Sequence, residues 1–247
     1  MTAIAENQPG AAIIIGAGDA TGGAAAAAFA RTGLVAVPVR RTADALAPLA
    51  TRIAAEGGRC LPIGADARDE EAMQALFEQV ERDIGPIEVL VFNIGANSPM
   101  GILDETVRRY RKIWEMCALA GFITAREAAR RMVPRGRGSI IFTGATASLR
   151  GSAGFAGFSG GKFALRSLAQ AMARELGPQG VHVAHVIIDG AIDTEFIRSN
   201  FPQRYALKDQ AGILDPEAIA AEYVRLHQQP RSAWTHELDL RPWLERW

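Results

Sequence analysis

The chain has 247 residues, of which 49% are hydrophobic, and its 27 basic residues balance its 27 acidic ones. This length is sufficient for one large core, and a formal charge of zero without a basic stripe argues against a nucleic-acid partner. The longest apolar stretch, residues 24–30, is too short to span a membrane, and residues 1–10 lack the pattern of a secretion signal. We therefore expect a cytoplasmic protein with no membrane partner.

Strand-like apolar runs alternate with helical patterns along the chain. The apolar runs predict strands at residues 11–15, 34–39, 59–63, 87–92, 139–143, 181–188 and 235–240. Helical periodicity predicts helices at residues 20–31, 42–56, 69–83, 104–132 and 155–176, and one more that Asp215 caps and Pro216 begins. Such alternation is typical of a single α/β domain, here residues 1–247, with a doubly wound parallel sheet.

Residues 189–214 are the longest stretch without clear periodicity. They exceed the usual length of a connection in an α/β protein. We interpret them as a candidate substrate lid, and an ordinary surface excursion with a short helix is the alternative. No motif within them identifies a substrate.

Cysteine and histidine do not predict a metal site. Cys60 and Cys117 are far apart in sequence and have apolar neighbours, which favours structural thiols in a reducing compartment. The four histidines have no spacing typical of metal ligands and are expected to be structural; they are His182, His185, His227 and His236.

A glycine-rich turn joins the first predicted strand to the first predicted helix. It contains Gly16, Gly18 and Gly22. Glycine allows a sharp turn and brings backbone N–H groups close to a phosphate, while the helix N-terminus adds a favourable dipole. The context between strand and helix predicts a dinucleotide site. A tight turn without a ligand is the alternative.

Two arginines follow the second predicted strand, Arg40 and Arg41. An acidic residue at this place would accept hydrogen bonds from a ribose 2′-hydroxyl, whereas arginine pairs with a 2′-phosphate. The sequence therefore favours NADP(H) over NAD(H). Two solvated arginines at a helix start are the alternative.

Phe158 stands four residues before Lys162, where a large family of nicotinamide-dependent enzymes places a Tyr-x-x-x-Lys pair. With the glycine turn, this spacing makes the chain resemble the short-chain dehydrogenase/reductase family over essentially its whole length. The resemblance implies a Rossmann fold, and its Gly-x-x-x-Gly-x-Gly motif falls at Gly16, Ala20 and Gly22, with alanine in the middle position. It also implies a homodimer or homotetramer formed through helix 104–132 and the helix that holds Phe158.

The same resemblance assigns further cofactor contacts. Asp66 corresponds to the acidic residue that holds the adenine amine, and Asn93 and Gly95 correspond to an Asn-Ala-Gly motif that supports the sheet and borders the cofactor. Gly190 and Thr194 correspond to residues at the nicotinamide end. For Asn93 a purely structural role is the favoured interpretation.

The proton-relay residues of the family are mostly replaced. Phe158 stands for the tyrosine, Ala145 for the serine and Ala118 for the asparagine, so Lys162 alone is retained. Phenylalanine and alanine cannot give or take a proton. Lys162 is expected to keep its second family role, a hydrogen bond to the nicotinamide ribose; an exposed lysine on a helix is the alternative.

Four nearby polar residues are considered as a substitute acid: Thr146, Ser148, Ser159 and Asp189. One helical step turns the Ser159 side chain about 100° away from that of Phe158. For Asp189 we favour capping of the following turn, which is common for Asp. General acid catalysis contributes about 10²–10⁴-fold, so its loss slows a reductase without excluding one.

Two functions remain open. The first is a divergent short-chain oxidoreductase that uses NADP(H) on a small organic substrate with an atypical proton source. The second is a non-catalytic protein of the same fold, a pseudoenzyme that binds NADP(H) or a metabolite as a sensor or partner subunit. The fold does not choose between them, and the intact cofactor frame favours the enzyme.

Overall fold

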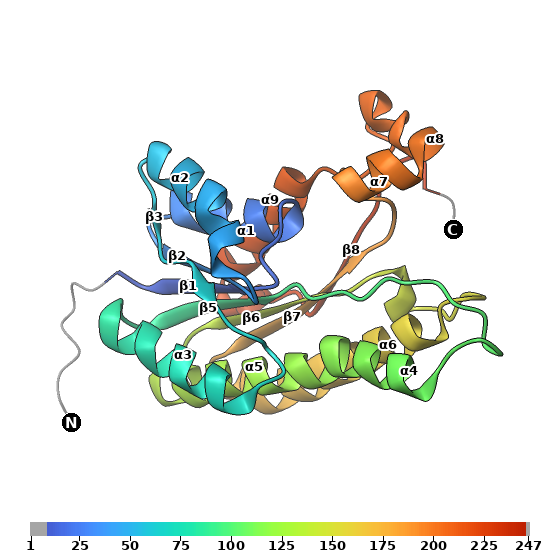
Figure 1. Cartoon of the computed structure of the whole chain (residues 1–247). Coiled ribbons are helices and arrows are strands. Elements are labelled where there is room, and N and C mark those ends of the chain that lie inside the picture. The colour runs from blue at the N-terminus through green and yellow to red at the C-terminus, as the bar shows by residue number, and fades with distance from the viewer. Residues whose placement is uncertain (1–8, 246–247) are drawn as a thin grey trace.

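An eight-stranded parallel sheet forms the centre of the computed structural model, which describes residues 9–245 (Figure 1). Its strand order is β3-β2-β1-β5-β6-β7-β8, and β4 also pairs with β2. The strands are β1 Ala11–Ile15, β2 Val35–Arg40, β3 Arg59–Cys60, β4 Ile63–Gly64, β5 Ile87–Phe92, β6 Ser139–Thr143, β7 His182–Ile188 and β8 Glu237–Leu240. The predicted α/β fold with a doubly wound parallel sheet is confirmed.

Helices cover both faces of the sheet because successive side chains of each strand point to opposite faces. Ile13 of β1 packs in the core beneath α3 (Glu70–Asp83), α5 (Ala120–Met132) and α6 (Ala156–Leu176), whereas Ile14 packs beneath α1 (Thr21–Arg31) and α9 (Pro216–Gln228). Figure 1 shows the two helical layers on either side of the sheet. The helices are α1 Thr21–Arg31, α2 Ala47–Ala55, α3 Glu70–Asp83, α4 Val107–Trp114, α5 Ala120–Met132, α6 Ala156–Leu176, α7 Glu195–Asn200, α8 Pro202–Tyr205 and α9 Pro216–Gln228.

The strand predicted at residues 59–63 is divided into β3 and β4. Pro62 lies between them and has no N–H to donate to a neighbouring strand, so the ladder with β2 is interrupted there. The prediction of one continuous strand was therefore wrong, although both halves pair with β2 in parallel.

The long helix predicted at residues 104–132 begins later and is not uniform. Thr106 caps α4, because its side chain accepts the N–H of Arg109. A π-helical turn at Glu115–Leu119 then separates α4 from α5. The prediction for the last long helix is confirmed, since Asp215 accepts the N–H of Glu217 at 3.0 Å at the start of α9.

Residues 189–214 contain the short helices α7 and α8. The base of this segment is closed by a parallel bridge between Ile192 and Leu214, and Asp193 N donates to Leu214 O at 2.8 Å. Figure 1 shows α7 and α8 set apart from the other helices.

None of the helices between residues 9 and 245 is long and apolar enough to cross a membrane. The expectation about a secretion signal rests on residues 1–10, of which 1–8 lie outside the described part of the chain.

Candidate functional site

Two adjoining cavities lie at the carboxyl ends of the strands. The smaller, of about 270 Å³, lies beside the ends of β1 and β2. The larger, of about 790 Å³, extends from the glycine turn to α6 and to α7 and α8. Gly16 and Gly18 line both cavities. Strand order reverses between β1 and β5, and the crevice at such a switch point is where open α/β sheets bind ligands.

The glycine turn leaves no room for a side chain at Gly22. A Cβ there would lie 2.5 Å from Gly16 O and 2.8 Å from Ala17 Cα, and Gly16 itself has a φ of +86°. Ala20, the residue that replaces the family's middle glycine, has a φ of −113°, outside the left-handed region that favours glycine. Among the described residues no side chain caps α1, and Ala20 and Gly22 line the larger cavity. The first-turn N–H groups are thus available to an anion, and the turn fits a dinucleotide phosphate.

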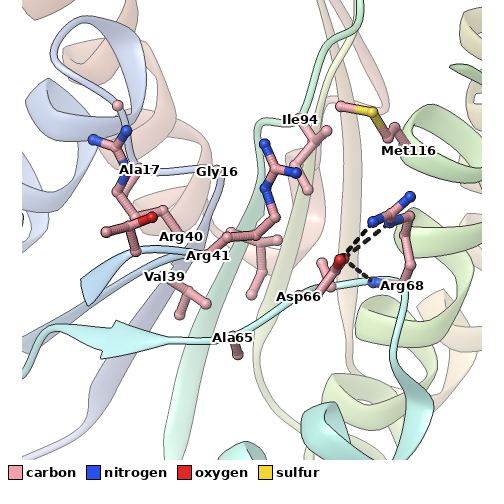
Figure 2. A pocket seen from close by; sticks show the side chains of 14 residues that line it. Gly16, Ala17, Val39, Arg40, Arg41, Ala65, Asp66, Arg68, Ile94 and Met116 are labelled. Carbon is pink, nitrogen blue, oxygen red and sulfur yellow. Dashed lines mark hydrogen bonds and ion pairs between the residues drawn. The ribbon is translucent and has the colours of Figure 1, made fainter. Parts of the chain in front are cut away.

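Three arginines surround the smaller cavity (Figure 2): Arg40, Arg41 and Arg68. Arg68 Nη2 donates to Asp66 at 2.6 Å, and Arg68 Nε donates to the other carboxylate oxygen at 3.0 Å. This guanidinium holds the pKa of Asp66 at about 2. Arg40 lies 3.9 Å from the fully exposed carboxylate of Asp19. The cavity thus combines a surplus of positive charge with one carboxylate that is already engaged.

Asn93 connects β5 to the glycine turn. Its Nδ2 donates to Gly16 O at 3.1 Å, which is the structural interaction that the sequence favoured. Asn93 and Gly95 both line the larger cavity.

Lys162 is buried, with 2% of its surface exposed, so the alternative of an exposed lysine is wrong. Its Nζ donates to Thr143 O at 2.7 Å and to Ile94 O at 3.1 Å, and it lies 5.9 Å from the centre of the Phe158 ring. These bonds tie the ends of β5 and β6 together. Burial lowers the pKa of Lys162. The side chain lines the larger cavity, and its third N–H remains for a ligand.

Phe158 and Ala145 line the same cavity as Lys162, so the structure brings these positions together. Ala118 does not line it and lies, 7% exposed, in the π-helical turn. The Phe158 ring packs with Ile113 and Ala147 and is 8% exposed. Neither Phe158 nor Ala145 supplies a hydroxyl to the cavity.

Of the four candidate polar residues, Thr146 and Asp189 form a pair. Thr146 Oγ1 donates to Asp189 Oδ1, and Arg241 Nη2 lies 3.8 Å from Asp189 Oδ2. Both Thr146 and Asp189 line the larger cavity, and Asp189 is 6% exposed. Within residues 9–245 no backbone N–H of the following turn donates to Asp189, so the favoured capping role was wrong.

The two candidate serines have other environments. Ser148 Oγ accepts the N–H of Ala145 at 3.1 Å and is fully buried. Ser159 lines the larger cavity, and its buried Oγ has no hydrogen-bond partner within the described residues.

Gly190 and Thr194 lie at the lid side of the larger cavity. Gly190 has a φ of +148°, and a Cβ there would meet Pro242 Cδ at 2.7 Å, so glycine is required. Thr194 caps α7 by accepting the N–H of Ile197 at 3.1 Å. Its hydroxyl proton remains free for a further acceptor.

His185 is fully buried behind Gly144, a residue of the cavity wall. A Cβ on Gly144 would lie 2.5 Å from His185 Nε2. Neither ring nitrogen makes a hydrogen bond to the part of the chain that the structure describes, and Glu237 Oε1 lies 3.5 Å from Nδ1. Burial lowers the pKa of His185 to about 4. This histidine was expected to be structural, and no spacing in the sequence indicates its place behind the cavity.

We expect His185→Leu to make the protein less sensitive to acid. The folded His185 has a pKa of about 4 and the unfolded one a pKa of about 6.5. Between these values the unfolded chain binds the extra proton, so the wild-type free energy of unfolding falls as the pH decreases from 6.5 to 4. Over this pH window the free energy of unfolding of the variant should fall by less than that of the wild type, with a difference of up to about 3 kcal/mol. Urea unfolding at several pH values measures this; equal pH slopes for the two proteins would contradict it.

Comparison with known proteins identifies relatives of the chain. Residues 10–204 match the family model described as short chain dehydrogenase. A crystal structure of a short-chain dehydrogenase from Rhodopseudomonas palustris is 44% identical and superposes with a TM-score of 0.82, covering 95% of this chain and 99% of that chain.

Two curated relatives have named activities. L-rhamnose 1-dehydrogenase (NAD(P)(+)) of Azotobacter vinelandii is 33% identical over 74% of this chain and 73% of its own length. The 3-oxoacyl-[acyl-carrier-protein] reductase MabA of Mycobacterium avium is 32% identical over 54% of this chain, and the match spans 52% of MabA. The matched region therefore covers only about half the length of MabA.

Proposed function

The chain belongs to the short-chain dehydrogenase family, and from that premise we propose that it is an oxidoreductase using NADP(H) on a small organic substrate. The observation that carries this proposal is the pair of adjoining cavities that share Gly16 and Gly18. The smaller suits an adenosine with a 2′-phosphate, and the larger suits the nicotinamide and substrate. When bound, the nicotinamide would give or accept a hydride.

The chain's own groups would hold the dinucleotide in an extended arrangement. The N–H groups of the glycine turn would bind the pyrophosphate, and Arg40 and Arg41 would bind the 2′-phosphate. The third N–H of Lys162 would bind the nicotinamide ribose, and Thr194 the carboxamide. Asp66 would accept a hydrogen bond from the adenine amine while both of its carboxylate oxygens also accept hydrogen bonds from Arg68.

The proton source of this proposed enzyme is the Thr146–Asp189 pair. In alcohol oxidation, the substrate hydroxyl gives its proton to Thr146 Oγ1 while the Thr146 proton moves to Asp189 Oδ1. In carbonyl reduction both transfers run in reverse. The existing hydrogen bond from Thr146 to Asp189 supports this path, because it joins the two groups within the cavity.

NADPH is expected to bind at least about tenfold more tightly than NADH. A hydrogen bond to a charged group contributes about 1.5–3 kcal/mol, which corresponds to about 10- to 100-fold in affinity. Calorimetric titration with both cofactors measures the preference, and Arg40→Gln with Arg41→Gln should abolish it. Arg108→Gln, on α4 outside both cavities, is the matched control and should change neither affinity. Equal affinities in the wild type would contradict the NADP(H) proposal.

A non-catalytic binding protein is the second candidate, and the absence of a hydroxyl at Phe158 and Ala145 favours it. Deuteride transfer from 4-deuterated NADPH separates the two. A panel of aldehydes, ketones, imines and enones is incubated with the protein, and products are analysed by mass spectrometry. Deuterium in any product supports the enzyme. Tight NADPH binding without deuterium in any product supports a sensor or partner subunit.

A homodimer or homotetramer is part of the same proposal. Large apolar side chains are exposed on α4, α5 and α6, the helices that the family resemblance places at the contact. They are Val107, Tyr110, Trp114, Phe122 and Phe163, with 76%, 42%, 41%, 42% and 42% of their surfaces exposed. A contact between copies would remove this apolar surface from water.

A further inference from the structure

Four phenylalanines line the larger cavity. Phe155 and Phe158 line it from the region of α6, and Phe196 and Phe201 line it from α7 and from the junction with α8. Phe196 and Phe201 are 54% and 47% exposed, and their rings meet edge to face at 5.9 Å. Apolar rings exposed along a cavity gain contact when an apolar ligand covers them.

Two arginines also line this cavity. Arg150 follows the 3₁₀ turn Thr146–Ser148, and Arg204 lies on α8. Neither guanidinium makes a hydrogen bond or ion pair to any residue between 9 and 245. Elsewhere in the chain arginines are commonly paired; Arg166, for example, binds Glu237 through both its Nε and its Nη2.

The other charges of the cavity do not neutralise these arginines. Lys162 donates to backbone carbonyls, and Asp189 accepts from Thr146. Asp19 lies near Arg40 at the glycine turn. Among the described residues, Glu245 is the remaining carboxylate of this cavity; it lies beside Gly190, where its Oε2 would be 3.4 Å from a Cβ. Within residues 9–245, two guanidinium groups against this one carboxylate leave the cavity with a positive surplus.

We propose that the substrate of this cavity is an amphipathic anion, an apolar body that carries a carboxylate or another oxyanion bound by Arg150 and Arg204. This inference rests on the proposed function, because it assigns a substrate class to the same cavity. Guanidinium groups bind such oxyanions through paired N–H donors, and the four phenylalanines cover the apolar body. The bound molecule would share this cavity with Thr146 and Lys162, where the proposed chemistry takes place.

Two fluorescent probes that differ in one sulfonate test the proposal. These are 1-anilinonaphthalene-8-sulfonate, which is anionic, and N-phenyl-1-naphthylamine, which is neutral. Titrations are made with saturating non-fluorescent NADP⁺ so that the phosphate sites are filled. We expect the anionic probe to bind about tenfold more tightly in low salt, because each exposed ion pair contributes modestly and the two add. The advantage should shrink at high ionic strength, where surface charges are screened.

Variants assign the effect to the two arginines. Arg150→Gln with Arg204→Gln should bring the anionic probe to the affinity of the neutral one and leave the neutral probe unchanged. Arg108→Gln is the matched control and should change the affinity of neither probe. Unchanged binding of the anionic probe in the double variant overturns the proposal. Failure of NADP⁺ to bind, measured separately by calorimetry, would instead contradict the proposed function, so the two failures are distinguishable.

Natural-like competitors identify the source of the oxyanion. Decanoate, decanol and decanoyl-coenzyme A are each used to displace the anionic probe. Displacement by decanoate and not by decanol supports a free carboxylate. Displacement by decanoyl-coenzyme A alone supports a phosphate-bearing carrier. If none of the three displaces the probe, or decanol does so as well as decanoate, the proposal is overturned.

Discussion

Ala145→Ser combined with Phe158→Tyr is expected to raise the rate of carbonyl reduction by about 10²-fold or more. The two substitutions restore a hydroxyl that orients the carbonyl and a phenol that donates a proton, and general acid catalysis contributes about 10²–10⁴-fold. Both positions line the larger cavity together with Lys162, whose positive charge favours an ionisable phenol beside it. The rate of NADPH oxidation with a panel of aldehydes and ketones measures the gain.

The controls for this double variant test where the hydroxyl must stand. Phe163→Tyr adds a phenol to the same helix at a position that is 42% exposed and does not line the cavity. Phe163→Tyr should leave the rate of carbonyl reduction unchanged. Ala145→Ser alone and Phe158→Tyr alone should each raise that rate by less than the double substitution. A double variant that folds and binds NADPH but reduces no faster than the wild type would show that these positions do not control proton transfer.

Asp189→Asn is expected to lower the rate of hydride transfer by about 10²-fold while cofactor affinity stays the same. An amide cannot take the proton that the Asp189 carboxylate receives through Thr146, so kcat falls and KM changes little. The reaction measured is the one with the fastest deuteride transfer in the panel. Thr146→Val should lower kcat similarly. Thr146→Ser keeps the hydroxyl and should therefore retain most of the wild-type kcat.

A merely structural role for Asp189 gives a different result. Asp193→Asn is the matched control, because Asp193 pairs with Lys208 at 2.8 Å and does not line the cavity. It should leave kcat unchanged. If Asp189→Asn retains the wild-type kcat, or Thr146→Val does, the proton passes through another group. If Asp189→Asn lowers the melting temperature and the loss of activity follows from the loss of folded protein, the effect of the substitution is structural instead.

The sequence was sufficient for most of the fold because the signals are local. Continuous apolar runs placed β1, β5 and β6 at their observed bounds, since doubly buried parallel strands are apolar throughout. Where the prediction differed, the cause was a local break. Pro62 divided one strand, and the π-helical turn at Glu115–Leu119 divided one helix. The proline signal was present in the sequence, and the π-helical turn had no signal in the periodicity.

The candidate site was predictable only in part. Spacing along one helix related Phe158 to Lys162, and the glycine turn related Gly16 to Gly22; all four residues line the larger cavity. These residues are close in sequence or belong to one turn, so a short pattern is enough to relate them. Their roles toward a cofactor and substrate stay predictions until binding and hydride transfer are measured.

By itself, the sequence determined the α/β architecture, the place of the glycine turn and the absence of a hydroxyl at position 158. Only the tertiary structure decided that Asp189 accepts from Thr146, that Lys162 is buried, and that Arg150 and Arg204 share one cavity. The physical reason is distance along the chain. Thr146 and Asp189 follow different strands, and residues so far apart meet only when β6 and β7 pair side by side and bring their carboxyl ends together.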